Sequence, residues 1–289
     1  MPLTVKAHAK LNLMLDILSA LPNGYHDLFM VMQSVSLYDL VTLEQNASGA
    51  ITVTCSDPAI PQGEGNLAYK AARVFFEETG ILCEGLSIAI EKHIPQAAGL
   101  AGGSADAAAV LVGLNRLFGA NLSDRDLIRL GASLGSDVPF CALGGLMMAQ
   151  YTGTVLSYLP ALQLGKIVIV TPDCAVSTGE AYKAFDTAER VRHLDKAGMF
   201  QSIMENDLDG VFRRIDNVFE QFIDVPERVV IKGVLRRNCA ECACMSGSGP
   251  SVFGIFESED DAEEAARALR RSFKNVFVCD CVDKGCEIV

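Results

Sequence analysis

The chain has 289 residues, of which 50% are hydrophobic and 21% are charged. At about 150 residues per domain this length favours two domains, and the apolar content suffices for a large core, which excludes disorder as the main state. Lys and Arg total 24 against 36 Asp and Glu, a net charge of −12. This balance argues against a general nucleic-acid-binding protein, although a pocket on an acidic protein can still be locally positive for a small anionic substrate.

We expect no targeting segment in this sequence. Lys6 and Lys10 interrupt any signal-peptide core. The longest uncharged stretch, residues 138–165, contains several glycines and prolines and is typical of loops and short strands rather than of a membrane span. We therefore expect a cytoplasmic protein without a membrane partner. No pattern predicts its oligomeric state.

The predicted elements alternate irregularly between strands and helices. Residues 3–17 form a long alternating strand in which Lys10 and Asn12 share one face. Further strands are predicted at 30–44, 50–55, 86–91, 166–171, 276–282 and after the turn in 245–256. Helices are predicted at 67–79 (capped by Asn66 and ended by Gly80), from the glycine-rich loop to Gly119, at 123–134 with a Ser123–Asp126 capping box, and at 207–223, 226–237 and 258–273. The mixed order favours an α+β fold with domains 1–160 and 161–289.

A glycine-rich loop, Gly99 to Ser104, leads directly into an apolar helix. Glycines allow the backbone to approach a ligand closely, and a helix N-terminus offers N–H groups and partial positive charge to a phosphate. The Ser104 hydroxyl can cap this helix or contact the ligand. The loop lacks the Gly-Lys-Ser/Thr of a Walker motif and the spacing of a dinucleotide fingerprint. A plain glycine turn before a buried helix is the alternative.

Ten cysteines are present, six of them near the C-terminus. The run Cys239 to Cys244, followed by Cys279 and Cys281, contains a CxxC spacing that could hold zinc. The CxC pairs are also typical of alternating positions in strands. We therefore expect buried thiols and no metal site, with a zinc protein kept as one alternative.

The loop is one of three motifs that together resemble the GHMP kinases, a superfamily of small-molecule kinases. The segment from Pro95 to Ser104 is similar to their phosphate-binding motif. Ala9–Leu13 resembles their first motif, and 245–251 resembles their glycine-rich third motif. Three further segments, 24–28, 134–140 and 206–208, narrow the resemblance to the members that act on a cytidine-diphosphate methylerythritol in non-mevalonate isoprenoid precursor biosynthesis.

The resemblance implies a two-domain α+β fold with the active site in the cleft between domains, and ATP-dependent phosphorylation of the substrate's 2-hydroxyl. Asp137 would be the catalytic base and Lys10 its partner, while Asn12 would orient the reacting groups. Tyr25 and His26 would hold the cytosine, with Tyr182 on its other face. ATP, accompanied by Mg²⁺, would be bound by Pro95, Gln96, Ala97, Ala98, Gly99, Leu100, Ala101, Gly102, Gly103, Ser104 and Ala105.

The residue chemistry is compatible with these roles. Phosphoryl transfer needs positioning, charge neutralisation and removal of the hydroxyl proton, which a carboxylate and an ammonium can supply together. Simpler interpretations remain: a solvated face for Lys10, a capped turn for Asp137, and a hairpin tip for Tyr25 and His26.

Two departures from the family pattern stand out. Ala97, Ala98 and Ala101 replace glycines in the loop, where positive φ would strain them. The segment after Gly145 lacks the arginine that relatives carry there, which puts a contact to the substrate's phosphates in doubt. Three functions therefore stay open besides the implied one: another GHMP kinase (of homoserine, mevalonate or a sugar), a catalytically silent ligand-binding paralogue, and the zinc protein.

Overall fold

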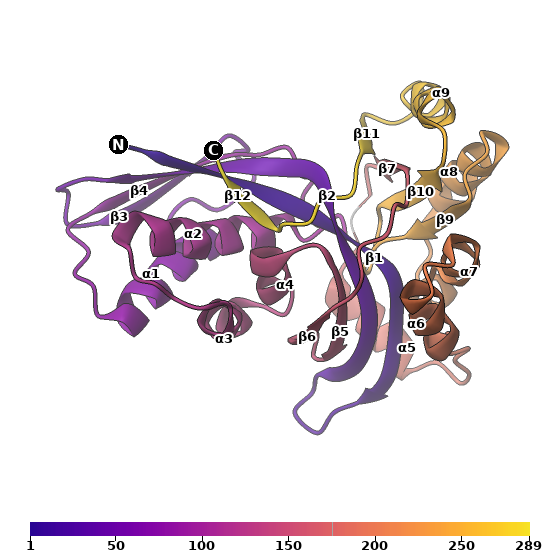
Figure 1. The fold of residues 1–289 in the computed structure, drawn as a ribbon, viewed down its shortest axis with the longest axis horizontal. Helices are drawn as coiled ribbons and strands as arrows, with labels where there is room; N and C mark the ends of the chain where they lie inside the picture. The colour runs from indigo at the N-terminus through magenta and orange to yellow at the C-terminus, as the bar shows by residue number, and fades with distance from the viewer. Residues whose placement is uncertain (175) are drawn as a thin grey trace.

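The computed structural model describes residues 1–174 and 176–289, which form two sheets with helices packed against them (Figure 1). The larger sheet has eight strands in the order β12-β1-β2-β4-β3, with β5 and β6 attached through β2 and β8 attached through β1. The smaller sheet has the order β11-β7-β10-β9. This mixture of helices and largely antiparallel strands confirms the predicted α+β class.

The strands of the larger sheet are β1 (Leu3–Ala20), β2 (His26–Gln45), β3 (Ile51–Cys55), β4 (Leu86–Glu91), β5 (Leu146–Tyr151), β6 (Val155–Tyr158), β8 (Asp216–Asn217) and β12 (Cys286–Ile288). Those of the smaller sheet are β7 (Lys166–Thr171), β9 (Cys242–Met245), β10 (Val252–Phe256) and β11 (Asn275–Cys279). The helices are α1 (Leu67–Thr79), α2 (Gly102–Phe118), α3 (Asp124–Leu134), α4 (Val138–Leu143), α5 (Thr178–Asp186), α6 (Lys196–Met204), α7 (Leu208–Arg214), the 3₁₀ turn η1 (Val218–Gln221), α8 (Pro226–Arg237) and α9 (Glu259–Leu269).

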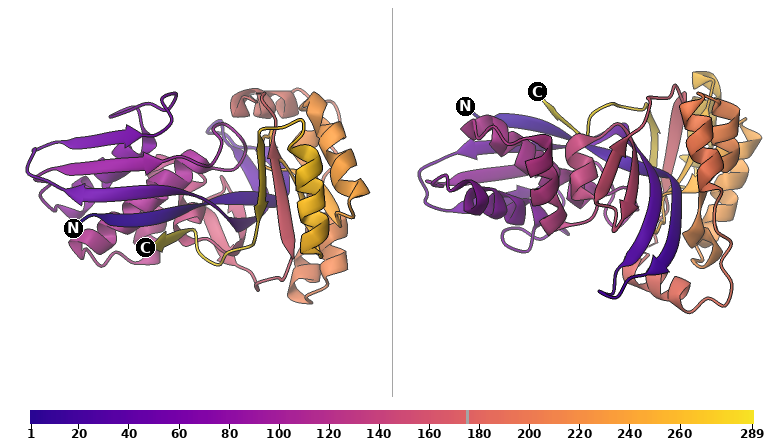
Figure 2. Two further views of the ribbon diagram at one scale, coloured as in Figure 1. Left: turned by 90° about the horizontal axis from the view of Figure 1, so that it is seen from above. Right: turned by 60° about the horizontal axis from the view of Figure 1, so that its bottom comes forward.

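Strands β1 and β2 of the larger sheet form a long hairpin, which extends beyond the rest of that sheet toward helix α5 (Figures 1 and 2). Its pairing register shifts between His8 and Lys10 and again between Asn12 and Met14. Such irregularities bend a strand and redirect its side chains. Lys10 and Asn12 therefore lie in a short stretch of regular pairing between two of these irregularities.

There are two hydrophobic cores, and the larger one extends across both sheets, since it includes Ile169 of β7 and Phe253 of β10. The larger contains residues of β1, β2 and the apolar face of α2, among them Leu11, Val41 and Leu111, all fully buried. The smaller lies between the second sheet and helices α8 and α9, around Ile231 and Phe256. The division predicted at residue 160 remains a prediction, since β8 and β12, which both follow it in the chain, pair with β1 of the first sheet.

The structure confirms the exact bounds of several predicted elements. These elements begin and end at capping residues that lie next to them in the sequence. Asn66 caps α1 through the Ala68 N–H, Gly80 ends that helix in the left-handed conformation, and the Ser123–Asp126 capping box starts α3. The helix predicted over 207–223 is wrong. It stops at Arg214, because Asp216 and Asn217 pair with β1 instead.

Candidate active site

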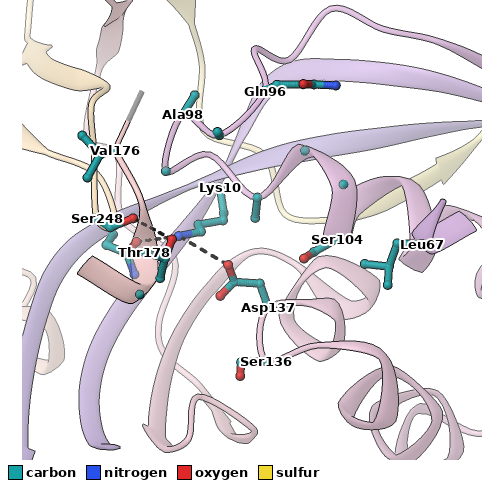
Figure 3. A pocket seen from close by; sticks show the side chains of 18 of the residues that line it. Lys10, Leu67, Gln96, Ala98, Ser104, Ser136, Asp137, Val176, Thr178 and Ser248 are labelled. Carbon is teal, nitrogen blue, oxygen red and sulfur yellow. Dashed lines mark hydrogen bonds and ion pairs between the residues drawn. The ribbon is translucent and has the colours of Figure 1, made fainter. Parts of the chain in front are cut away.

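A cavity of about 930 Å³ lies where the hairpin, the glycine-rich loop and the start of α5 meet (Figure 3). Of the predicted site residues it is lined by Lys10, Asn12, Tyr25, His26, Asp137, Tyr182 and most of the stretch from Pro95 to Ser104. Two predicted ATP-binding residues, Leu100 and Ala105, do not line it: both side chains are fully buried in the core. The structure thus brings together residues from 10 to 248 in the sequence.

Lys10, Asn12 and Asp137 form the polar centre of this cavity. The Lys10 Nζ donates to Asn12 Oδ1 at 2.6 Å and lies 3.8 Å from Asp137 Oδ2, the two side chains pointing toward one another (Figure 3). Lys10 is nearly buried, whereas the Asp137 side chain is 32% exposed. Asp137 occupies the position before α4 but makes no side-chain capping bond. The simpler interpretation of Asp137 as a helix cap therefore fails, and its carboxylate is available to a ligand.

Three residues of the glycine-rich loop have the positive φ that glycine favours, and two of them are alanines. Gly99 has φ +75°, while Ala97 and Ala101 have φ 47° and 59°. α2 begins at Gly102 and its first turn closes with the Ala105 N–H on the Ala101 carbonyl. Ser104 is therefore inside the first turn and does not cap the helix. The N–H groups of residues 102–104 precede this bond and are those that a helix start offers to an anion.

The third motif joins the other two through one serine. Ser246 Oγ donates to the Gly99 carbonyl at 2.9 Å and accepts from the Asn12 N–H at 3.2 Å. The approach is so close that a Cβ on Gly99 would stand 2.0 Å from the Ser246 carbonyl oxygen. Asn12 and Ser246 are 234 residues apart, and through Ser246 the three motifs form one contact cluster.

Three predicted substrate-binding residues, Tyr25, His26 and Tyr182, form the aromatic side of the cavity. Tyr25 is 59% exposed, and His26 is buried at the start of β2. His26 Nε2 lies 2.7 Å from Asp186 Oδ1, and the His26 ring stacks on Tyr182 with centroids 4.5 Å apart. Tyr182 of α5 lines the same cavity with one face of its ring against His26, and its place on the other face of the cytosine stays a prediction. Burial raises the pKa of the Tyr182 phenol, which remains neutral.

Some residues of the site were missed by the sequence patterns. Thr178 and Ser248 share a hydrogen bond of 3.0 Å across the mouth, and Asp186 contacts His26. Lys92 and Asp106 line the cavity beneath the glycine-rich loop. A polar residue at a buried helical position, such as Asp106, is a signal that could have been noticed, whereas Asp186 lies on an amphipathic helix whose pattern does not distinguish it.

The cysteines of the described residues form no metal-binding cluster. Within the described residues all ten are free, and no three His, Cys, Asp or Glu side chains lie close enough together to hold a metal ion. Cys242 and Cys244 occupy β9, as the alternating pattern indicated. In the same part of the chain no helix combines the length and apolarity required to cross a membrane.

The fold and the three converging motifs are those of a small-molecule kinase. Residues 66–145 match the family described as GHMP kinases N terminal domain, and residues 199–275 match GHMP kinases C terminal. The chain belongs to the GHMP kinase family.

Two full-length relatives within that family carry the same name. The chain is 42% identical over 97% of its length to the 4-diphosphocytidyl-2-C-methyl-D-erythritol kinase of Acetivibrio thermocellus, covering 99% of that protein. The same-named kinase of Clostridium botulinum is 38% identical over 96% of the chain, with 99% of that protein covered.

Solved structures agree with this. A crystal structure of 4-(cytidine 5'-diphospho)-2C-methyl-D-erythritol kinase superposes with a TM-score of 0.76 at 33% identity, over 96% of this chain and 98% of the other. The homoserine kinase of Cytophaga hutchinsonii gives a TM-score of 0.80 at 21% identity, over 100% and 97%. At that identity the second likeness shows the fold alone.

Proposed function

We propose that this protein is an ATP-dependent kinase that phosphorylates the 2-hydroxyl of 4-diphosphocytidyl-2-C-methyl-D-erythritol, a step of non-mevalonate isoprenoid precursor biosynthesis. The observation that carries the proposal is the Lys10–Asp137 pair, which lies in one cavity with the glycine-rich loop and with Tyr25 and His26. The full-length relatives named above support the choice of substrate. A cytoplasmic location remains the prediction made from the sequence.

In this proposal the phosphates of ATP bind at the start of α2. The N–H groups of residues 102–104 and the helix dipole stabilise the phosphate charge there. Mg²⁺ would enter with ATP and be held mainly by phosphate oxygens and water, as this ion commonly is. That mode fits a cavity whose described residues offer no group of three metal-ligating side chains. Bound Mg²⁺ would neutralise charge on the transferring phosphoryl group.

The proposed acceptor chemistry belongs to Asp137 and Lys10. The Asp137 carboxylate removes the proton of the attacking hydroxyl, and the Lys10 ammonium stabilises the negative charge that develops on that oxygen. Asn12 holds the Lys10 Nζ at 2.6 Å and so fixes the ammonium beside Asp137. With Lys10 almost excluded from water, its electrostatic effect on the transition state is stronger than at a surface.

The cytosine would bind against Tyr25 and His26. The exposed Tyr25 ring offers a face for stacking, which accepts any base. His26, oriented by Asp186 and by the Tyr182 ring, offers a directional hydrogen bond, which does not. The preference for cytosine is therefore proposed to come from His26.

Phosphorus NMR of the product tests this proposal. Incubation with ATP and the cytidine-diphosphate substrate should give a new phosphomonoester signal while the diphosphate of the substrate stays intact. Release of CMP or CDP, or a phosphate at another hydroxyl, would contradict the proposal. If the wild-type protein bound the substrate and ATP without turnover, the protein would instead be the catalytically silent paralogue.

A further inference from the structure

A serine hydroxyl joins strand β1 to the glycine-rich loop. β1 pairs with β2 along one side, and the N–H groups of alternate residues of a strand point to the same side. The Lys10 N–H donates to the Leu100 carbonyl at 3.2 Å. Two residues further on, the Asn12 N–H donates to Ser246 Oγ at 3.2 Å, and Ser246 Oγ donates to the Gly99 carbonyl at 2.9 Å. The loop therefore follows the edge of β1 through two links, the first direct and the second through Ser246.

The second link requires a side chain that both accepts and donates a hydrogen bond. A hydroxyl does both, whereas an alkyl side chain does neither. Ser246 is fully buried, so removal of its hydroxyl leaves the Asn12 N–H and the Gly99 carbonyl without this partner. Buried backbone groups without partners are costly, so the two segments shift until each group finds another one. The hydroxyl thus determines how the loop lies against β1 at this point.

Ser246 is itself held in place from both sides. The side-chain amide of Asn217 donates to the carbonyls of Met245 and Gly247 at 2.7 and 2.8 Å. The Ser246 N–H donates to the Ser251 carbonyl at 2.9 Å. Asn217 belongs to β8, which pairs with β1. The hydroxyl therefore has a defined position relative to β1 before any ligand binds.

The two links join the groups that the proposed reaction brings together. Lys10 and Asn12 carry the side chains beside Asp137, and the loop leads directly into α2, whose first N–H groups are proposed to bind the phosphates of ATP. The distance from the acceptor hydroxyl to the transferred phosphoryl group therefore depends on how the loop lies against β1. Reacting atoms must approach to about 3–3.5 Å, and a misplacement of about 1 Å can cost about 10²-fold in rate.

We propose that Ser246 is a positioning residue for phosphoryl transfer, whose hydroxyl sets the distance between the Lys10–Asn12 pair and the start of α2. Its neighbours Gly247 and Ser248 line the cavity, but Ser246 is not among the described residues that do so. Loss of the hydroxyl therefore slows transfer between bound substrates and leaves their binding nearly unchanged. The inference rests on the proposed function, since it concerns transfer between the two substrates assigned there.

Steady-state kinetics of Ser246→Ala with ATP and the cytidine-diphosphate substrate tests the inference. The kcat should fall about 10- to 100-fold, while both KM values stay within about threefold of the wild type. Ser246→Thr, which keeps the hydroxyl, should retain a kcat within about threefold of the wild type. If Ser246→Ala does not fold, Ser246→Cys, whose thiol is a weak donor and a weak acceptor, takes its place with the same expectation.

Thr171→Val is the matched control. Thr171 is 5% exposed, and its hydroxyl shares a hydrogen bond of 2.7 Å with Ser251 Oγ. This change also removes one buried hydroxyl, so it should lower the thermal midpoint by a few degrees, as Ser246→Ala does, but keep the wild-type kcat.

Three outcomes would overturn the inference while leaving the proposed kinase function intact. They are a kcat of Ser246→Ala within threefold of the wild type, an equal fall in Ser246→Ala and Thr171→Val, and an equal fall in Ser246→Ala and Ser246→Thr. A wild type that does not turn over the cytidine-diphosphate substrate would overturn both the inference and the proposed function.

Discussion

At the scale of single residues, Asp137 is distinguished by what it does not do. Asp137 occupies the N-cap position of α4, but its carboxylate makes no hydrogen bond to the N–H groups of that helix. The carboxylate lies 3.8 Å from Lys10 Nζ instead. Asp137→Asn should keep the fold and ATP affinity but lower turnover by about 10²–10⁴, the usual effect of removing a general base. Steady-state kinetics combined with nucleotide binding would check this. Turnover near the wild-type rate would remove Asp137 from the proposed chemistry.

Lys10→Met tests the partner of that base. Methionine keeps the length of the side chain but removes the ammonium that Asn12 holds. We expect kcat to fall by about 10²–10³ through lost electrostatic stabilisation, with a smaller change in the substrate KM. Lys6→Met, on the same strand in an exposed pair with Glu287, is the control and should be silent. A purely KM effect of Lys10→Met would make Lys10 a binding residue only.

Asp186 is the residue whose role the sequence did not reveal. Its Oδ1 lies 2.7 Å from His26 Nε2 and so fixes the orientation of the imidazole. Asp186→Ala should raise the KM of the cytidine substrate severalfold and reduce the preference over its uridine analogue, with the ATP KM unchanged. Glu180→Ala, an exposed change on the same helix, should do neither. An altered ATP KM would place the base pocket elsewhere.

At the scale of elements, the start of α2 contains two glycines with different surroundings. A Cβ on Gly102 would meet Lys92 Nζ at 2.9 Å and Ile94 Cγ2 at 3.0 Å, whereas one on Gly103 meets nothing within 4 Å. Gly103→Val should therefore leave the thermal midpoint within about 2 °C but weaken ATP binding, because its side chain enters the space proposed for phosphate. Gly102→Val should lose both stability, by about 1–3 kcal/mol, and ATP binding. Thermal melts and nucleotide titrations separate the two; normal ATP affinity in Gly103→Val would contradict this location of the phosphate.

The sequence predicted elements well where their limits are set locally. The cap residues of α1 and the capping box of α3 lie within a few residues of the elements they define. It failed at 207–223, where the side chain of Asn217 donates to the carbonyls of Met245 and Gly247, about 30 residues away. Such a partner is invisible to periodicity. The same holds for the site: the motifs identified the loop and Lys10, but Asp186 acts through His26, which is 160 residues away in the sequence.

At the scale of the whole molecule, the buried aspartate Asp16 connects the β1–β2 hairpin to residues 193–196, at the start of α6. Asp16 of β1 is fully buried and accepts from Lys196 Nζ at 2.9 Å, from the Leu194 N–H and from His193 Nδ1, both at 3.2 Å. Asp16→Ala should cost about 2–4 kcal/mol of the free energy of unfolding, because it leaves three donors without their acceptor. Chemical denaturation would measure this. A loss below about 0.5 kcal/mol, the scale of an exposed pair, would show that this contact does not hold the halves together.

The central claim concerns the molecule's choice of substrate, and one measurement tests it most directly. ADP release is followed with ATP and, in parallel, the cytidine-diphosphate methylerythritol, homoserine and mevalonate at equal concentration. We predict rapid ADP release with the cytidine substrate alone, its kcat/KM exceeding that of the others by at least about 10³, because substrates that lack a base cannot make the hydrogen bond proposed for His26. Faster ADP release with homoserine or mevalonate would contradict the proposed function.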